Sequence, residues 1–178
     1  MVNVYLAEGF EEVEAISVID MLRRAEIQVT TISIDKKLVK GAHNIIVEAD
    51  MVLGQENESD MIFLPGGMPG VTNLFKCEAL KDIVVKQNSE GKFIAAICAA
   101  PMILGQLGLL EGKNAVSYPG FEKYLKGGNV LFDNVCRDGN IITSRGAGTA
   151  LEFSYELIKI LKNAETAAKI KEGIIDNR

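Results

Sequence analysis

Short apolar strands alternate with amphipathic helices along most of this chain, and this order restricts the fold more than any other feature. We predict strands over residues 2–7, 27–34, 60–67 and 93–98, the third of them ending in a glycine turn. Strands that are apolar throughout are buried on both faces, which requires helices above and below a parallel sheet. The alternation therefore predicts an α/β fold, a doubly wound sandwich with a mostly parallel sheet.

The predicted helices and hairpins fill the segments between and after these strands. A helix from Glu11 carries Ala15, Val18, Ile19 and Leu22 on one face. Further helices are predicted over 77–92, 100–110, 121–126, 149–161 and 164–175, and hairpins over 36–50, turning at Gly41, and 130–146, turning at Asp138-Gly139. With 178 residues and no linker or repeat, we expect one domain over 1–178.

Charge and cysteine content exclude several classes of function. The net charge of -5 and the pI of about 5.0 give a field that repels nucleic acid and anionic lipid. The longest apolar run, 93–104, is too short to span a bilayer, and the first residues do not resemble a signal peptide. Three cysteines without a C-x-x-C pair and a single histidine are typical of a reducing compartment and of a chain without structural zinc. We therefore expect a cytoplasmic protein with no metal, no other cofactor, no nucleic-acid partner and no membrane association.

Cys98 lies where the strand over 93–98 gives way to a helix, with Ala96 and Ala100 two residues away on either side. This spacing resembles the G-x-S-x-G nucleophile elbow, in which a sharp strand-to-helix turn brings backbone close to the nucleophile. Free cysteine is also a common core residue, which is our interpretation of Cys77 and Cys136. At Cys98 the following helix would direct its N-terminal N–H groups at the sulfur, which favours the thiolate and a lowered pKa. The spacing alone leaves both a core cysteine and a reactive thiol open at this position.

Two further segments are expected at the same edge of the sheet. "EGFEEVE" places Glu11 and Glu14 at the start of a helix's buried face, and periodicity alone does not decide which of them points into the crevice. A carboxyl group beside a thiolate would share one proton with it. "LPGGMPG" offers backbone N–H groups of the kind that form an oxyanion pocket. We interpret His43, in the hairpin over 36–50, as a surface residue.

Four motifs together resemble the ThiJ/PfpI superfamily, specifically its DJ-one subgroup, which is associated with parkinsonism. They are "EGFEEVEA", "FLPGG", "AAICAAP" and "ITSRGAGTALEF", in the order and at the spacing of that family. The resemblance covers nearly the whole chain and implies a flavodoxin-like sandwich that forms a homodimer. It implies that Cys98 is the nucleophilic, oxidation-sensitive cysteine and that Glu14, rather than Glu11, is the protonated glutamate bonded to it. It also implies oxyanion or substrate contacts from Gly66, Gly67, Ala99 and Arg145, with Arg145 near the dimer contact.

This sequence departs from the family pattern at two positions that concern the chemistry. Tyr118 stands where many members have a histidine that pairs with the cysteine. A phenol with a pKa of about 10 is a poor general base near neutral pH, although it can donate a hydrogen bond, so Glu14 is left as the main candidate for proton transfer. His43 stands where the subgroup often has another pocket arginine, so we expect an anion to be held less firmly.

The combined features predict a cofactor-independent enzyme in which Cys98 attacks a reactive α-oxoaldehyde such as methylglyoxal, or its adduct with an amine. Glu14 would move the proton as the adduct rearranges to lactate, and the substrate class comes from the resemblance alone. The alternative is a redox-sensing, protective or chaperone-like protein in which Cys98 is oxidised to sulfenic and then sulfinic acid. Cysteine peptidase or amidase activity and a thiamine-pathway role are less favoured, because the usual histidine and a phosphate-binding motif are absent from the sequence.

Overall fold

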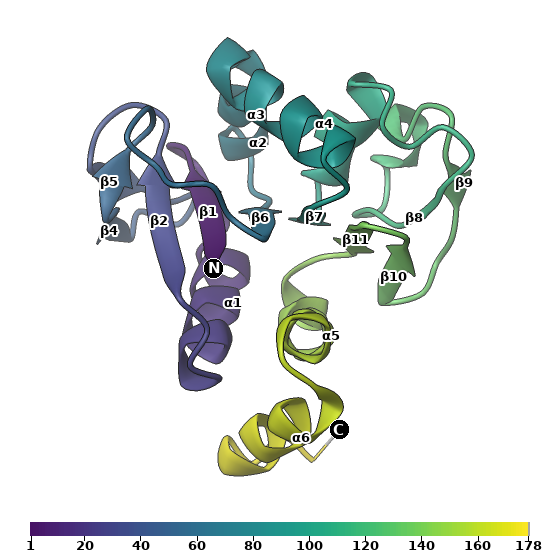
Figure 1. The fold of residues 1–178 in the computed structure, drawn as a ribbon. Coiled ribbons are helices and arrows are strands. Elements are labelled where there is room, and N and C mark those ends of the chain that lie inside the picture. Colours follow the sequence, from purple (N-terminus) through teal and green to yellow (C-terminus); the bar gives the residue numbers. More distant parts are fainter. Residues whose placement is uncertain (178) are drawn as a thin grey trace.

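A seven-stranded sheet forms the central layer of the computed structural model, which describes residues 1–177 (Figure 1). Its strands are β1 Val2–Leu6, β2 Val29–Ser33, β5 Met51–Val52, β6 Met61–Leu64, β7 Phe93–Ile97, β10 Val135–Asp138 and β11 Ile141–Ser144. They lie in the order β10-β11-β7-β6-β1-β2-β5, and every neighbouring pair is parallel except the edge hairpin of β10 and β11. The predicted mostly parallel sheet is therefore confirmed.

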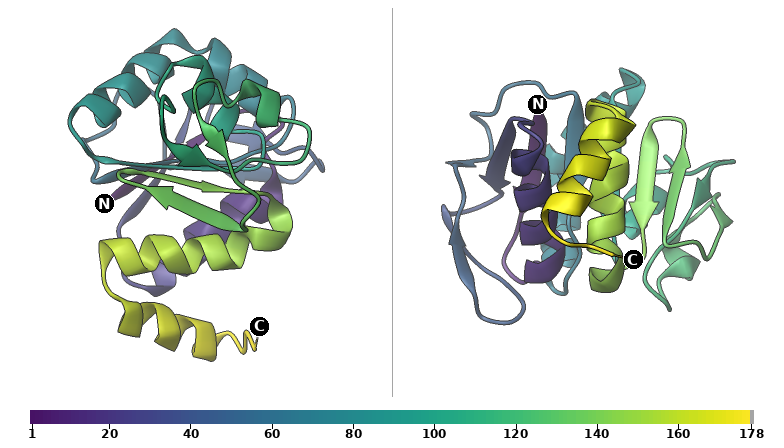
Figure 2. Two further views of the ribbon diagram at one scale, coloured as in Figure 1. Left: turned by 90° about the vertical axis from the view of Figure 1, so that its right-hand side faces the viewer. Right: turned by 90° about the horizontal axis from the view of Figure 1, so that it is seen from below.

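Helices cover both faces of this sheet. Their bounds are α1 Glu12–Arg24, α2 Gly70–Lys76, α3 Glu78–Ser89, α4 Pro101–Gln106, α5 Ala150–Leu161 and α6 Ala164–Gly173. Figure 2 shows α2, α3 and α4 on one face and α1 and α5 on the other, with α6 packed outside α5. The predicted α/β sandwich is confirmed. Within residues 1–177, no helix is long and apolar enough to cross a membrane.

The smaller elements flank the main sheet. β3 Leu38–Lys40 and β4 Ile46–Glu48 form an antiparallel hairpin, and β8 Asn114–Ala115 pairs in parallel with β9 Asn129–Val130. Short 3-10 helices occupy Glu122–Tyr124 and Ala147–Thr149. Both predicted hairpins are confirmed, and the second turns at Gly139, which has a φ of 61°.

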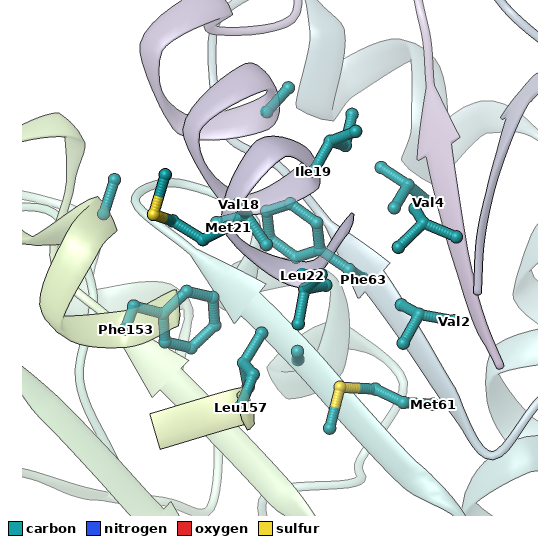
Figure 3. Close-up of a cluster of buried hydrophobic side chains, with 14 of the residues drawn as sticks. Val2, Val4, Val18, Ile19, Met21, Leu22, Met61, Phe63, Phe153 and Leu157 are labelled. Atoms are coloured by element: carbon teal, nitrogen blue, oxygen red, sulfur yellow. The ribbon is translucent and has the colours of Figure 1, made fainter. Parts of the chain in front are cut away.

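Apolar side chains fill the layer between the sheet and the pair α1 and α5. Figure 3 shows Leu22 of α1 among them, beside Phe63 of β6 and Phe153 of α5. The Phe63 and Phe153 ring centroids lie 5.9 Å apart, within the range of favourable aromatic contacts. Burying one such side chain stabilises the fold by about 2 kcal/mol. This packing holds α1 against the sheet, so its first turn stays near the carboxyl ends of β1 and β6.

The helix prediction differs from the structure in two places: one helix ends early and one was missed. The helix predicted over 100–110 ends at Gln106, because Gly108 adopts a φ of 72° and Leu109 N–H donates to the Leu104 carbonyl, a glycine-terminated helix end. The short helix α2 was not predicted. It starts inside the loop rich in proline and glycine that follows β6, and those residues are poor helix formers.

Candidate active site

Cys98 occupies the tight turn between β7 and α4, where its φ is 65°. Residues other than glycine adopt this left-handed region at a cost of roughly 1–2 kcal/mol, so surrounding contacts must hold it. The Cys98 N–H donates to the Ser144 carbonyl at 2.9 Å, and the Cys98 carbonyl accepts the Tyr118 N–H at 2.8 Å. The side chain is half-buried. The predicted elbow is therefore present, and it lies at the carboxyl edge of the sheet.

Glu14 lies in the first turn of α1 with only 1% of its surface exposed. Its Oε2 accepts the Gly66 N–H at 2.9 Å, and its carboxyl group hydrogen-bonds to Cys98. Glu11 is the extended residue just before the helix, and its side chain lies beside His43 instead. The structure therefore places Glu14, not Glu11, against the cysteine.

The glycine loop after β6 meets the two side chains through different backbone groups. The Gly66 N–H is taken by Glu14, whereas the N–H groups of Gly67 and Ala99 hydrogen-bond to the Cys98 sulfur. Gly66 is also needed for space, because a Cβ there would lie 2.5 Å from Cys98 Cβ, 3.0 Å from its sulfur and closer still to Glu14. Gly66 therefore faces both side chains, and its N–H positions Glu14 rather than bonding to the sulfur.

Tyr118 and the turn after β11 lie on another side of Glu14 and Cys98. The Tyr118 side chain is 50% exposed, and its ring lies so close to Gly146 that a Cβ there would be 3.2 Å from the ring. The same Cβ position is 3.8 Å from Glu14 Oε1. Sequence reasoning did not single out Gly146, although it lies within the motif "ITSRGAGTALEF". The Tyr118 ring and the Glu14 carboxyl group therefore both lie against Gly146.

Arg145 precedes this glycine but directs its guanidinium elsewhere in the described structure. Nη1 donates to the Phe132 carbonyl at 3.3 Å, and the guanidinium lies 6.0 Å from the centre of the Phe132 ring. Phe132 is itself 69% exposed. These contacts hold Arg145 at the surface near the site, rather than on Cys98 or Glu14.

Burial is the main influence on the proton affinity of the central pair. It raises the pKa of Glu14 to about 7, although hydrogen bonds from Cys98 and Gly66 favour the carboxylate. Burial also raises the pKa of Cys98 to about 12, and the adjacent Glu14 carboxylate adds to the rise, while the Ala99 and Gly67 N–H groups oppose it. The predicted lowered pKa of Cys98 is therefore wrong while Glu14 is ionised. The short helix α4 and two N–H groups do not outweigh desolvation and a neighbouring like charge.

Protonation of Glu14 changes this balance. A neutral carboxyl group no longer repels a thiolate, and its O–H can donate a hydrogen bond to the sulfur. As the pH rises through about 7 the pair loses the first of its two protons. The remaining proton can then lie on the sulfur, beside a carboxylate, or on the carboxyl group, beside a thiolate. Cys98 can therefore act as a nucleophile while Glu14, in contact with it, accepts the thiol proton.

A second charged cluster lies beside the site. Glu12 is 5% exposed and accepts the N–H groups of His43 at 2.7 Å and Ile45 at 3.3 Å, and His43 Nδ1 lies 2.9 Å from its other oxygen. The hydrogen bond with Glu12 raises the pKa of His43. The His43 side chain is 68% exposed, which agrees with its interpretation as a surface residue. Glu11 is 3.6 Å from the same nitrogen, so the three residues have ligand atoms close enough to hold a cation. Their contacts in this structure fasten the β3–β4 loop to α1.

The other two cysteines lie in separate parts of the fold. Cys77 joins α2 to α3 and is partly buried, and Cys136 is a buried residue of β10. Cys77 packs against an apolar cluster and Cys136 is buried, as expected of core residues. All three cysteines of the described chain are free thiols.

Residues 1–160 match the model of the DJ-1/PfpI family. Protein DJ-1 homolog A of Arabidopsis thaliana is 42% identical over 96% of this chain, which spans 45% of that longer protein. The glutathione-independent glyoxalase DJR-1.2 of Caenorhabditis elegans is 34% identical, covering 89% of this chain and 86% of its own length. The solved structure of oxidized Toxoplasma gondii DJ-1 matches with a TM-score of 0.95 at 37% identity, covering 99% of this chain and 98% of that one.

Proposed function

This chain belongs to the DJ-1/PfpI family, and we propose that it is a cofactor-independent enzyme acting on reactive α-oxoaldehydes such as methylglyoxal. The observation that carries this proposal is the contact of half-buried Cys98 with buried Glu14, whose pKa is raised to about 7 by burial. A carboxyl group that exchanges its proton near neutral pH is suited to general acid–base catalysis. The substrate class comes from the name of the Caenorhabditis elegans glyoxalase.

The proposed reaction begins when the Cys98 proton passes to Glu14. The sulfur attacks the aldehyde carbon, a C–S bond forms, and the carbonyl electron pair moves to oxygen, which takes the proton back from Glu14 to give a hemithioacetal. The N–H groups of Gly67 and Ala99, which contact the sulfur in the free protein, are the proposed donors to the developing oxyanion.

The Glu14 carboxylate then removes the proton from the former aldehyde carbon and returns it to the neighbouring ketone carbon, while the hydroxyl proton on the first carbon passes to the ketone oxygen. This transfer oxidises the first carbon and reduces the second, so the hemithioacetal becomes a thioester of lactate. Water cleaves the C–S bond, which releases lactate and restores the Cys98 thiol. The net reaction adds one water molecule to methylglyoxal, so it needs no external oxidant, reductant or cofactor.

The test is to incubate the purified protein with methylglyoxal and to measure lactate. We expect Cys98→Ser and Glu14→Gln each to lower kcat by roughly 10²–10⁴-fold. Matched controls are Cys77→Ser and Glu78→Gln, the latter in the corresponding first turn of α3, and both should retain activity. Folded protein that forms no lactate, or that forms it equally well without Cys98, would contradict the proposal.

A second candidate is a redox-responsive protein in which peroxide oxidises Cys98 to the sulfinic acid. It is favoured by a partly buried cysteine beside a buried carboxyl group, since protonated Glu14 can donate to a sulfinate oxygen. The related Toxoplasma gondii structure is of an oxidized DJ-1. Mild peroxide followed by mass measurement tests this role: two added oxygens per chain on Cys98, without lactate formation, favour it over the enzyme.

We also propose that the protein is a homodimer that uses the start of α1. Val13, Ile16, Ile45 and Ile46 are large apolar residues with 52%, 42%, 55% and 61% exposure, and Glu12 ties the Ile45 backbone to α1. Exposed apolar side chains gathered in one region mark interfaces. Light scattering after size exclusion should give twice the chain mass, and Ile16→Asp should give the chain mass. A similar charge on α3, Val85→Asp, is the control and should leave the dimer intact.

We further propose that the protein works in the cytoplasm as a single domain over residues 1–178. Three free cysteines support a reducing compartment. Fractionation of cells that express the native protein tests the location. A single unfolding transition that coincides by fluorescence and circular dichroism tests the single domain, and two separate transitions would contradict it.

A further inference from the structure

Glu11, Glu12 and His43 form a mixed cluster of carboxylates and imidazole that the proposed reaction does not use. The two glutamates lie at the start of α1, and His43 lies in the turn between β3 and β4. One ligand atom from each residue lies within 4.8 Å of the other two. Among the described residues, this is the one group of three or more such side chains with that spacing. The fold therefore gathers three metal-binding groups from separate segments.

The distances within the cluster match the spacing of ligands around a small divalent cation. His43 Nδ1 lies 2.9 Å from Glu12 Oε2 and 3.6 Å from Glu11 Oε1. Zn²⁺ binds imidazole nitrogen and carboxylate oxygen at about 2.0–2.2 Å, so the ligands of a tetrahedral site lie about 3.3 Å apart. The two distances fall on either side of this value. Small side-chain movements therefore bring all three atoms to bonding distance of one ion.

Glu12 is already held in the position of a ligand. Its side chain is 6% exposed, and Oε1 accepts the backbone N–H groups of His43 and Ile45. Gly41 makes room for it, because a Cβ there would collide with the Glu12 carboxyl group. In metal sites, hydrogen bonds to the second oxygen of a carboxylate fix the first one for binding. Oε1 has this support, and Oε2 lies beside His43 Nδ1.

The charges of the cluster also favour a cation. Within residues 1–177, His43 is the only basic side chain within ion-pair distance of Glu11 or Glu12. A protonated imidazole balances one of the two carboxylates at most, although Glu12 is nearly buried and buried charges need partners. A divalent cation beside a neutral imidazole balances both carboxylates.

We propose that Glu11, Glu12 and His43 bind a zinc ion through one oxygen of each carboxylate and Nδ1 of the imidazole, with water in the fourth position. Imidazole suits Zn²⁺ better than Mg²⁺ or Ca²⁺, which prefer oxygen ligands alone. The sequence-based expectation of no metal rested on cysteine and histidine, whereas two of these three ligands are carboxylates.

This site is separate from the reacting pair. Glu14, and neither of the two glutamates before it, makes the hydrogen bond to Cys98. A thiol beside a carboxyl group can also bind zinc, so the experiment must distinguish the two places.

The test is a titration of the purified, metal-free full chain with zinc chloride in competition with a colorimetric zinc indicator. We expect one Zn²⁺ per chain in the wild type and also in Cys98→Ser. Loss of one ligand, in His43→Gln or Glu11→Gln, should weaken binding at least about tenfold. The matched control is Glu48→Gln, at an exposed glutamate of β4, which should bind zinc like the wild type.

A second measurement reports the ligand atom directly. His43 is the single histidine of the chain, so its imidazole nitrogen resonances need no further assignment. In the isotope-labelled chain, saturating zinc should shift the Nδ1 resonance more than that of Nε2.

Three outcomes overturn the proposal. Zinc that leaves the His43 resonances unchanged does not bind at this cluster. Binding that is lost in Cys98→Ser but kept in His43→Gln assigns the ion to the thiol. Absence of saturable binding in the wild type assigns the cluster to hydrogen bonding alone. Because His43 is exposed, His43→Gln should fold and decide the question even where a glutamate variant does not.

Discussion

Replacing Glu14 by Gln tests the idea that one buried carboxyl group makes the fold sensitive to pH. Glu14 is 1% exposed, and burial raises its pKa from 4.5 to about 7. Gln has nearly the same volume, can still accept the Gly66 N–H and can still donate to Cys98, but it cannot ionise. The Glu14→Gln variant therefore removes the titration and leaves the packing in place.

The sign and size of the effect follow from the raised pKa. The folded protein binds this proton more tightly than the unfolded chain, so the stability from protonated Glu14 is complete below pH 4.5 and is lost as the pH rises through about 7. A rise in pKa from 4.5 to about 7 corresponds to about 3 kcal/mol of unfolding free energy. The loss is the same whether the charge settles on Glu14 or on Cys98, because the pair releases one proton in either case.

Urea unfolding at a series of pH values between 4.5 and above 7 measures this effect. Other carboxyl groups titrate in the same range, so the informative quantity is the difference between the wild type and Glu14→Gln. As the pH rises across this range, the unfolding free energy of Glu14→Gln should increase by about 3 kcal/mol relative to that of the wild type. Glu78→Gln, at an exposed glutamate in the first turn of α3, should show the wild-type dependence. If the unfolding free energies of the wild type and Glu14→Gln depend on pH in the same way, the reasoning is refuted.

Three further predictions concern the neighbouring groups. In the Gln variant described above, the pKa of Cys98 should fall below its wild-type value because the carboxylate charge is gone, and the alkylation rate by iodoacetamide against pH measures this; an unchanged profile contradicts it. Gly66→Ala should cost about 1–3 kcal/mol in urea unfolding because its Cβ meets the site atoms, whereas Gly148→Ala, in open space, should cost little. Glu12→Gln should lower the pKa of His43, because its hydrogen-bonded carboxylate raises it; an NMR titration of the single histidine checks this.

Local sequence pattern predicted those features that depend on near neighbours in the chain. The small residues around Cys98 predicted the elbow, and Asp138-Gly139 predicted a hairpin turn that the structure contains. The pattern missed α2, which starts among proline and glycine residues. It also extended the helix over 100–110 beyond its real end, which Gly108 sets. The order of the strands and their register were not predicted, because pairing joins segments far apart in the chain.

The sequence by itself determined the α/β class, the place of Cys98 at the end of a strand and the order of the four motifs. Periodicity left Glu11 and Glu14 open, the family resemblance pointed to Glu14, and the tertiary structure places Glu14 against the sulfur. Only the tertiary structure decided that the Gly66 N–H bonds to Glu14 while the Gly67 N–H bonds to Cys98. It also reversed the expected direction of the pKa of Cys98 while Glu14 is ionised. The physical reason is that proton affinity depends on burial and on distances of a few ångströms between groups from separate parts of the chain, which no local pattern contains.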